Sequence, residues 1–179
     1  GLCRALAMTA YLDTTSERAP AFEEAEAEGR KAVALDRDDV TAYVFLGIAL
    51  LTHGVTVGHP ENGIKTLEKG VAINPNAPYL QSTFGRALVY SGRAADGTER
   101  LVTAMRLSPR DIQLPQFMEV VTTGYFTLED YEAVLEWSTK AHNASATATY
   151  HRVAAVRIAA LAALDRPAKA KSECEALMA

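Results

Sequence analysis

Two stretches of sequence decide the fold: ENGIKTLEKGVAINP at residues 61–75 and ADGTERLVTAMRLSP at residues 95–109. They match at positions 34 residues apart, which carry small, large apolar or proline side chains: Gly63 and Gly97, Leu67 and Leu101, Gly70 and Ala104, Ile73 and Leu107, Pro75 and Pro109. Each stretch ends at a proline, which cannot donate the next helical hydrogen bond. Both stretches are therefore predicted to be helices of an internal repeat.

Another helix is predicted before each of these stretches, at residues 42–53 and 80–91. Each has a glycine near its middle, Gly47 or Gly85, directly after a large apolar residue, Leu46 or Phe84. Small residues let two helices approach closely, and large apolar residues fill the gaps between such contacts. We therefore expect Gly85 and Ala104 to be buried where helices touch. The pattern resembles the tetratricopeptide repeat (TPR), whose unit of 34 residues is two antiparallel helices.

Weaker copies extend the repeat over nearly all of the 179 residues. Residues 22–35 match a second helix, residues 131–141 match one that comes three residues late, and residues 149–164 and 167–178 form a last pair. Four extra residues fall near 54–59, so residues 52–60 are predicted to be an exposed loop. The opening helix is expected at 2–12, followed by a connection at 13–20.

The predicted fold is all-α, a right-handed α-solenoid of about five TPR-like antiparallel helix pairs and about ten helices. A single repeat domain, 1–179, would contain units at approximately 1–37, 38–75, 76–109, 110–146 and 147–179. Because the chain begins Gly1-Leu2-Cys3 without a methionine, we expect it to be a fragment of a longer protein.

Composition excludes several classes of protein. Hydrophobic residues make up 49% and charged residues 22%, which is too apolar for a disordered chain. The 18 Lys and Arg against 22 Asp and Glu give a net charge of −4, with no basic run, so nucleic acid is not an expected partner. No uncharged apolar run is long enough to span a membrane. Cys3 and Cys174 lie far apart without metal-ligand spacing, as is usual in the reducing cytoplasm, where we expect the protein.

No residue pattern indicates catalysis, a metal or a cofactor. The four histidines lack the spacing of a zinc motif, and we expect them in loops or exposed to solvent. The acidic run at residues 23–28 is interpreted as a solvated face near a helix start. Phosphate loops and nucleophile elbows are absent from the sequence. We predict no catalytic residue, and a small enzyme is the weakest hypothesis.

Binding of a protein or peptide is better supported, because stacked helix pairs present a concave face lined by the first helix of each pair. Helical spacing places six candidate residues on that face, beside Val89: Tyr79, Ser82, Arg86, Tyr90, Gln113 and Gln116. Arg and Tyr often anchor interfaces. The alternative for the two tyrosines is packing between repeats. A clamp for acidic chaperone tails is excluded, because Val44, Ile48 and Ser82 stand where basic or amide groups would be needed.

A narrower resemblance comes from residues 92–111 and 131–137. They are similar to the carboxy-terminal repeat region of bacterial class III adenylate cyclases and winged-helix transcriptional regulators. That resemblance implies a regulatory or interaction module with no catalysis of its own, and any cyclase activity would belong to another domain.

Self-association is the alternative function, as a homodimer through the solenoid ends. Apolar stripes occur in both terminal helices: Leu2, Leu6 and Met8 in the first, and Ala170, Cys174, Leu177 and Met178 in the last. Exposed apolar patches of this kind tend to find partners.

Overall fold

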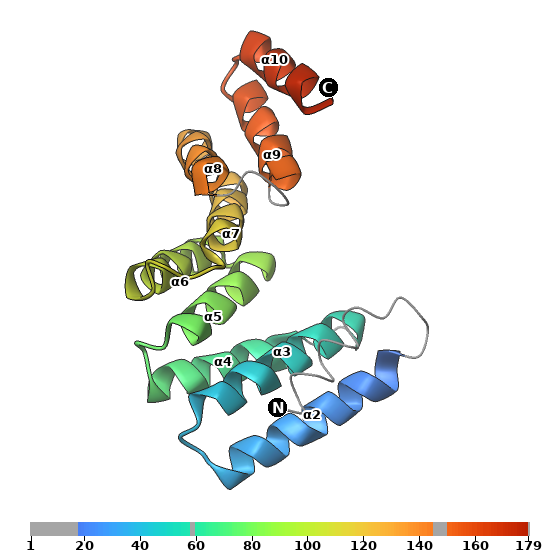
Figure 1. Cartoon of the computed structure of the whole chain (residues 1–179). Helices are drawn as coiled ribbons and strands as arrows, with labels where there is room; N and C mark the ends of the chain where they lie inside the picture. Colours follow the sequence, from blue (N-terminus) through green and yellow to red (C-terminus); the bar gives the residue numbers. More distant parts are fainter. Residues whose placement is uncertain (1–17, 58–59, 145–149, 179) are drawn as a thin grey trace. The chain divides into compact units, whose positions relative to one another are not determined.

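The computed structural model describes residues 18–57, 60–144 and 150–178. These ranges contain nine α-helices and no strand, which confirms the all-α prediction (Figure 1). In chain order the helices are α2 (Arg18–Leu35), α3 (Val40–Val57), α4 (Glu61–Ile73), α5 (Pro78–Tyr90), α6 (Ala94–Leu107), α7 (Leu114–Thr127), α8 (Tyr131–Ala144), α9 (Tyr150–Ala163) and α10 (Pro167–Met178). The chain divides into two compact units, Gly1–Ala87 and Leu88–Ala179, with the division inside α5.

In the first unit, α2 packs on α3 and α3 packs on α4. Small residues make the close contacts, as predicted: a Cβ atom added at Gly47 would lie 2.6 Å from the Leu67 side chain, and one at Gly63 would lie 2.8 Å from the Gly47 carbonyl oxygen. Gly85 of α5 is buried as well. Close-packed interiors do not accommodate such extra atoms without shifts.

In the second unit, each helix from α6 to α10 packs on the next, and α7 also packs on α9. Five buried side chains form an apolar cluster, with Met105, Leu114, Tyr125 and Trp137 packed against it: Val89, Leu101, Phe117, Val120 and Val121. Ala104 is fully buried, as its repeat position predicts.

Three turns of the second unit have the same backbone geometry. The second residue after each first helix adopts a positive φ: 88° at Gly92, 59° at Glu129 and 54° at Asp165. The following N–H donates back across six residues: Arg93 to the Leu88 oxygen at 2.9 Å, Asp130 to Tyr125 at 3.0 Å and Arg166 to Leu161 at 2.9 Å. This hydrogen bond closes the Schellman motif, a common helix end. The turns therefore align the repeats, with shifts of 37 residues from Gly92 to Glu129 and 36 from there to Asp165.

The predicted loop at residues 52–60 is wrong over most of its length. Helix α3 continues to Val57, and Gly54 is buried. The four extra residues lengthen the helix instead of forming a loop, so α3 has 18 residues where α5 has 13. The added turn packs on α2, where the ring of His53 stacks on Phe22 with centroids 6.2 Å apart. Residues 58 and 59 lie outside the described residues.

Two further boundaries differ from the prediction or cannot be compared with it. Residues 18–20, predicted as part of a connection, belong to α2. The predicted opening helix at 2–12 lies outside the described residues, as does the rest of that connection.

Candidate functional site

Two of the three predicted binding residues in the first unit are exposed on α5. Tyr79 is 41% exposed, with its ring 6.2 Å from that of Phe45, and Arg86 is exposed. Ser82 is only 1% exposed, and its hydroxyl donates to the Tyr79 carbonyl oxygen at 3.0 Å. The expectation that Ser82 lines a surface is therefore corrected. Its side chain is small and its hydroxyl is hydrogen-bonded within α5, so it can be buried.

In the second unit, Tyr90 is 65% exposed and Gln116 is exposed. Gln113 is half-buried and precedes α7, where its backbone N–H donates to the Asp111 carboxylate at 2.8 Å. Alignment on the turns places Gln116 at the position of Tyr79, 37 residues later. Gln116 is therefore an exposed residue at the position of α7 that corresponds to Tyr79 of α5, whereas Gln113 lies in the turn before α7.

The corresponding face of α7 and α9 contains an ion pair that the sequence did not predict. Glu119, at the aligned position of Ser82, is only 8% exposed. One carboxylate oxygen accepts a hydrogen bond from Nη2 of the largely exposed Arg152 of α9 at 3.0 Å, and the other lies 2.5 Å from Nε of Arg152 in an ion pair. The signal was the three-residue delay of the repeat, which moves the inner positions of α7 from Gln113 and Gln116 to Gln116 and Glu119.

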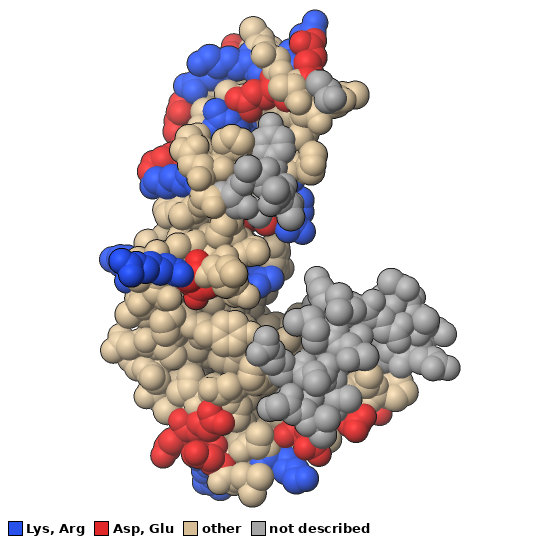
Figure 2. Space-filling model, in the orientation of Figure 1, with Lys and Arg blue, Asp and Glu red and all other residues tan. Residues whose placement is uncertain are grey.

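Charges of both signs are mixed over part of the second unit. Over α8, α9 and α10, Figure 2 shows Lys and Arg side chains lying among Asp and Glu side chains. The described residues contain no group of three or more His, Cys, Asp or Glu placed to hold a metal ion. Among the same residues, no helix is both long and apolar enough to cross a bilayer.

Glu26 corrects the interpretation of the acidic run as a solvated helix start. Helix α2 begins at Arg18, two turns before Glu26, whose carboxylate lies 3.4 Å from Nδ1 of His53 on α3 and 2.6 Å from Nη2 of Arg30 on α2. Burial raises the pKa of the Glu26 carboxyl, but the hydrogen bonds with Arg30 and His53 and the electrostatic attraction to both together outweigh burial and bring the pKa below its ordinary value. His53 is therefore half-buried in a helix; His142 and His151 are exposed as predicted, on α8 and α9, and His59 lies outside the described residues.

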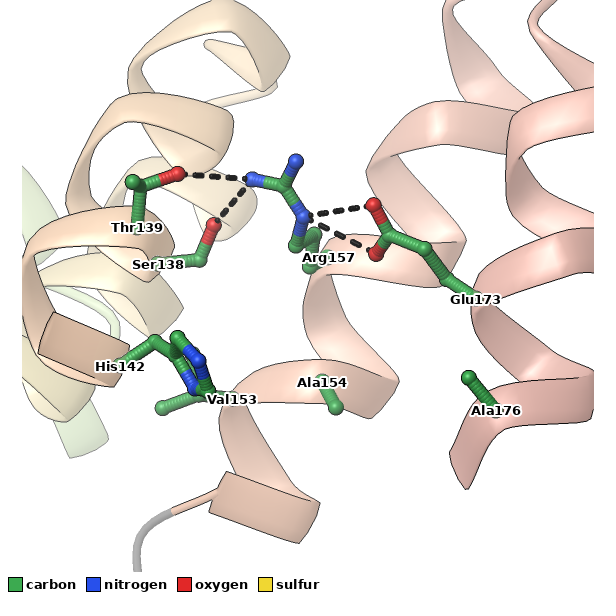
Figure 3. A pocket seen from close by; sticks show the side chains of 8 residues that line it. All are labelled: Ser138, Thr139, His142, Val153, Ala154, Arg157, Glu173 and Ala176. Atoms are coloured by element: carbon green, nitrogen blue, oxygen red, sulfur yellow. Dashed lines mark hydrogen bonds and ion pairs between the residues drawn. The ribbon is translucent and has the colours of Figure 1, made fainter. Parts of the chain in front are cut away.

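A cavity of about 240 Å³ lies among α8, α9 and α10 (Figure 3). Ser138, Thr139 and His142 line it from α8, Val153, Ala154 and Arg157 from α9, and Glu173 and Ala176 from α10. The Arg157 Nε donates to both carboxylate oxygens of Glu173, at 3.0 and 2.9 Å. Its Nη1 lies 2.9 Å from the Leu135 carbonyl oxygen and about as close to the Ser138 and Thr139 hydroxyls, at 3.0 and 3.1 Å. One guanidinium thus joins three helices.

The sequence alone did not reveal this cavity. Arg157 lies on a helix whose apolar stripe is otherwise regular. Only an alignment of the repeats on their turns shows that Arg157 occupies a position that is buried in the earlier repeats. The aligned positions are Val121, 36 residues earlier, and Phe84, 37 residues before that, both buried. An arginine in such a series is the signal that could have indicated a polar interior.

The chain is similar to several solved helical-repeat structures. A MamA fragment from Desulfovibrio magneticus RS-1 matches with a TM-score of 0.78 and 16% identity, covering 99% of this chain and 92% of that one. Another MamA crystal structure matches with a TM-score of 0.74 and 15% identity over 89% of this chain and 88% of that one. A Podosopora anserina putative kinesin light chain variant with TPR-like repeats has a TM-score of 0.73 and 14% identity, covering 98% and 92% of the two chains. These likenesses show the TPR-like solenoid fold.

No protein-family model matches the sequence. No curated protein matches it either.

Proposed function

We propose that the chain is a non-catalytic interaction module that binds a segment of a partner protein on the exposed faces of its first helices. The observation that carries this proposal is the pair formed by Glu119 and Arg152 beside Gln116. It places a buried carboxylate, an exposed guanidinium and an exposed amide on one face of α7 and α9. Such groups recognise the polar backbone of a bound segment with fixed geometry.

The first unit offers a face of different chemistry. Tyr79 and Arg86 stand two helical turns apart on α5, so their side chains point the same way. Tyr and Arg each combine a large contact area with hydrogen-bonding groups of fixed geometry. For this reason they contribute most of the binding energy at many interfaces. Each unit therefore carries its own set of candidate contacts.

Peptide selection tests the proposal without a known partner. Peptides are selected from a random display library on the immobilised chain, and the Kd of the enriched peptide is measured by titration calorimetry. We expect Tyr79→Ala or Arg86→Ala, or in the second unit Gln116→Ala or Arg152→Ala, to weaken binding about tenfold or more, the effect of about 1.4 kcal/mol.

Matched controls lie on the second helices of the same units. Lys69→Ala on α4 and Arg106→Ala on α6 remove exposed cations elsewhere on the chain. The proposal is contradicted if no peptide is enriched, or if the control variants weaken the enriched peptide while the four first-helix variants do not.

The finer proposal concerns context: a regulatory carboxy-terminal part of a bacterial cytoplasmic signalling protein such as an adenylate cyclase. Its support is the resemblance of residues 92–111 and 131–137 to the repeats of such proteins. Sequencing the gene upstream of Gly1 tests it. A cyclase or winged-helix domain in the same reading frame supports the proposal, and a different upstream sequence contradicts it.

Self-association is the second candidate, and the observation in its favour is Met178, which is 83% exposed at the end of α10. The other residues of the apolar stripe on α10 are less exposed than Met178: Ala170 is buried, and Cys174 and Leu177 are half-buried. Sedimentation at micromolar concentration decides between a single chain of 19.3 kDa and a dimer. If a dimer forms through this end, Leu177→Glu should separate it without unfolding the repeats.

A further inference from the structure

The cavity of α8, α9 and α10 occupies the place that apolar side chains fill one repeat earlier. The turns align α6 with α8 by 37 residues, and α7 and α8 with α9 and α10 by 36 residues. Every lining residue of the cavity can therefore be compared with its counterpart among α6, α7 and α8. Five of those counterparts belong to one apolar cluster: Leu101, Met105, Phe117, Val121 and Trp137.

The substitutions at these positions all remove apolar volume or introduce polar atoms. In order along the chain, Leu101 is replaced by Ser138, Met105 by His142, Phe117 by Val153, Met118 by Ala154, Val121 by Arg157 and Trp137 by Glu173. Loss of large side chains from a core is destabilising unless something fills the space. Departures from a local rule of this kind are expected at functional sites.

Three of the polar side chains that line the cavity are hydrogen-bonded to one another: Ser138, Thr139 and Arg157. The Ser138 and Thr139 hydroxyls donate to the Leu135 carbonyl oxygen and accept from Arg157. The Glu173 carboxylate accepts from Arg157 Nε, yet each carboxylate oxygen can accept a further hydrogen bond. Glu173 can therefore accept a hydrogen bond from an additional donor. Val153, Ala154 and Ala176 form an apolar wall beside it (Figure 3).

We propose that this cavity receives one aromatic side chain that carries a hydrogen-bond donor, a tryptophan or tyrosine of a bound protein segment. The ring would lie against Val153, Ala154 and Ala176, and its N–H or O–H would donate to Glu173. The proposal rests on the proposed function in one respect, that the occupant belongs to a protein.

Size and charge select this class of occupant. A cavity of about 150 Å³ binds benzene, so about 240 Å³ is enough for a substituted or two-ring aromatic group. A cationic side chain is disfavoured because the Arg157 guanidinium lies against Glu173. A phenylalanine would fill the space but leave the remaining acceptor capacity of Glu173 unused. A neutral aromatic donor satisfies both the volume and the acceptor.

The direct test uses N-acetyl-tryptophanamide as the probe and the whole chain as the receptor. Titration followed by two-dimensional NMR should shift the resonances of Val153, Ala154 and Ala176 in a saturable way, with a millimolar Kd as expected for one side chain. N-acetyl-phenylalaninamide should bind several-fold more weakly because it has no side-chain donor. Equal binding of the two probes, or no saturable shift at these three residues, would overturn the proposal.

Two variants give the test its control. Ala154→Met restores the residue found at Met118 and fills the cavity, so probe binding should fall at least tenfold. Ala155→Met puts the same side chain on the exposed face of α9 and should leave binding unchanged. Should Ala154→Met fail to fold, Ala176→Leu serves instead, because Ala176 is an exposed lining residue and a larger apolar side chain there would occupy the cavity. Retained probe affinity in a folded Ala154→Met or Ala176→Leu protein contradicts the proposal.

The peptide selected on the first-helix faces separates this inference from the proposed function. If that peptide binds and the probe does not, the interaction module stands and the aromatic site fails. If the probe binds and no peptide is enriched, the site stands as a receptor for a single aromatic group and the proposed first-helix function fails.

Discussion

The interface of α6, α7 and α8 and the interface of α8, α9 and α10 share their turn geometry but differ in what lies inside. The first is an apolar cluster centred on Leu101, Phe117 and Val121. The second has a polar-lined cavity spanned by Arg157 and Glu173. Helix α8 belongs to both, with Trp137 packed against the first and Ser138, the next residue, facing the second.

This difference teaches that the backbone of the repeat does not require a fully apolar interior. A repeat is held by its own pair of helices and by its neighbours. The tight turns and the small residues that are buried at aligned positions of both interfaces, such as Gly124 and Ala160, are enough to define the helix pair. The interior positions of the last repeat are then available to carry polar groups and a cavity.

The largest expected effect comes from truncating the centre of the apolar interface. Phe117→Ala should lower the free energy of unfolding by about 3–5 kcal/mol, because Phe117 is fully buried and its loss leaves a cavity. Val153→Ala, at the aligned position beside the existing cavity, should cost about 1.5 kcal/mol, from two methyl groups at about 0.8 each. Urea denaturation followed by circular dichroism measures both. A cost of Val153→Ala well above about 1.5 kcal/mol would show that the second interface is as closely packed as the first, because a cavity term would then add to the loss of the two methyl groups.

The next effect is overpacking at a position that changes size between the repeats. Ala104 and Ala141 are buried, whereas the aligned residue of α10 is Leu177, which is half-buried. Ala104→Leu should cost about 1–3 kcal/mol by overpacking, and Gly85→Leu should cost a similar amount. The reverse change, Leu177→Ala, should cost about 1 kcal/mol because half of the side chain is already exposed. A thermal melt unchanged by Ala104→Leu would mean that the repeats are misaligned.

A third comparison isolates the contribution of the polar network. Arg157→Ala removes hydrogen bonds to α8 and α10 together and should cost about 1–3 kcal/mol. Lys140→Ala breaks an exposed pair with Glu136 on α8 alone and should cost less than about 0.5 kcal/mol. Hydrogen exchange should show the Arg157→Ala effect as faster opening of α10, which Arg157 joins to α8. Unchanged protection of α10 would argue against that connection.

The spacing of residues along the sequence was enough to predict the helix pairs, but it did not predict which side chains face inward. Pairs such as Gly63 and Gly97 or Leu67 and Leu101 keep a fixed separation, so the helix pairs follow from them. The face of α7 could be placed only after the three-residue delay was fixed by the turn at Glu129, which moves Glu119 inward. Residues 52–57 contain Gly54 and several β-branched side chains, all of which have low helix propensity. Packing of His53 on Phe22 nevertheless extends the helix. Local preference is a weak guide where tertiary contacts decide.

The smallest expected effect concerns Glu26, a polar contact at the edge of the first unit rather than in its interior. Because the pKa of Glu26 is lowered in the folded chain, its ionised form stabilises folding. That contribution is present above the ordinary pKa of 4.5 and is lost as the pH falls through the folded value. Glu26→Gln should therefore be less stable than the unchanged chain at pH 7, and the difference should shrink in acid. Urea midpoints measured from pH 7 to about pH 3 check this, with Glu24→Gln, an exposed neighbour on α2, as the matched control. A difference that stays constant across this range would mean that the amide perturbs packing and that the contact with Arg30 and His53 is not what stabilises the helix pair.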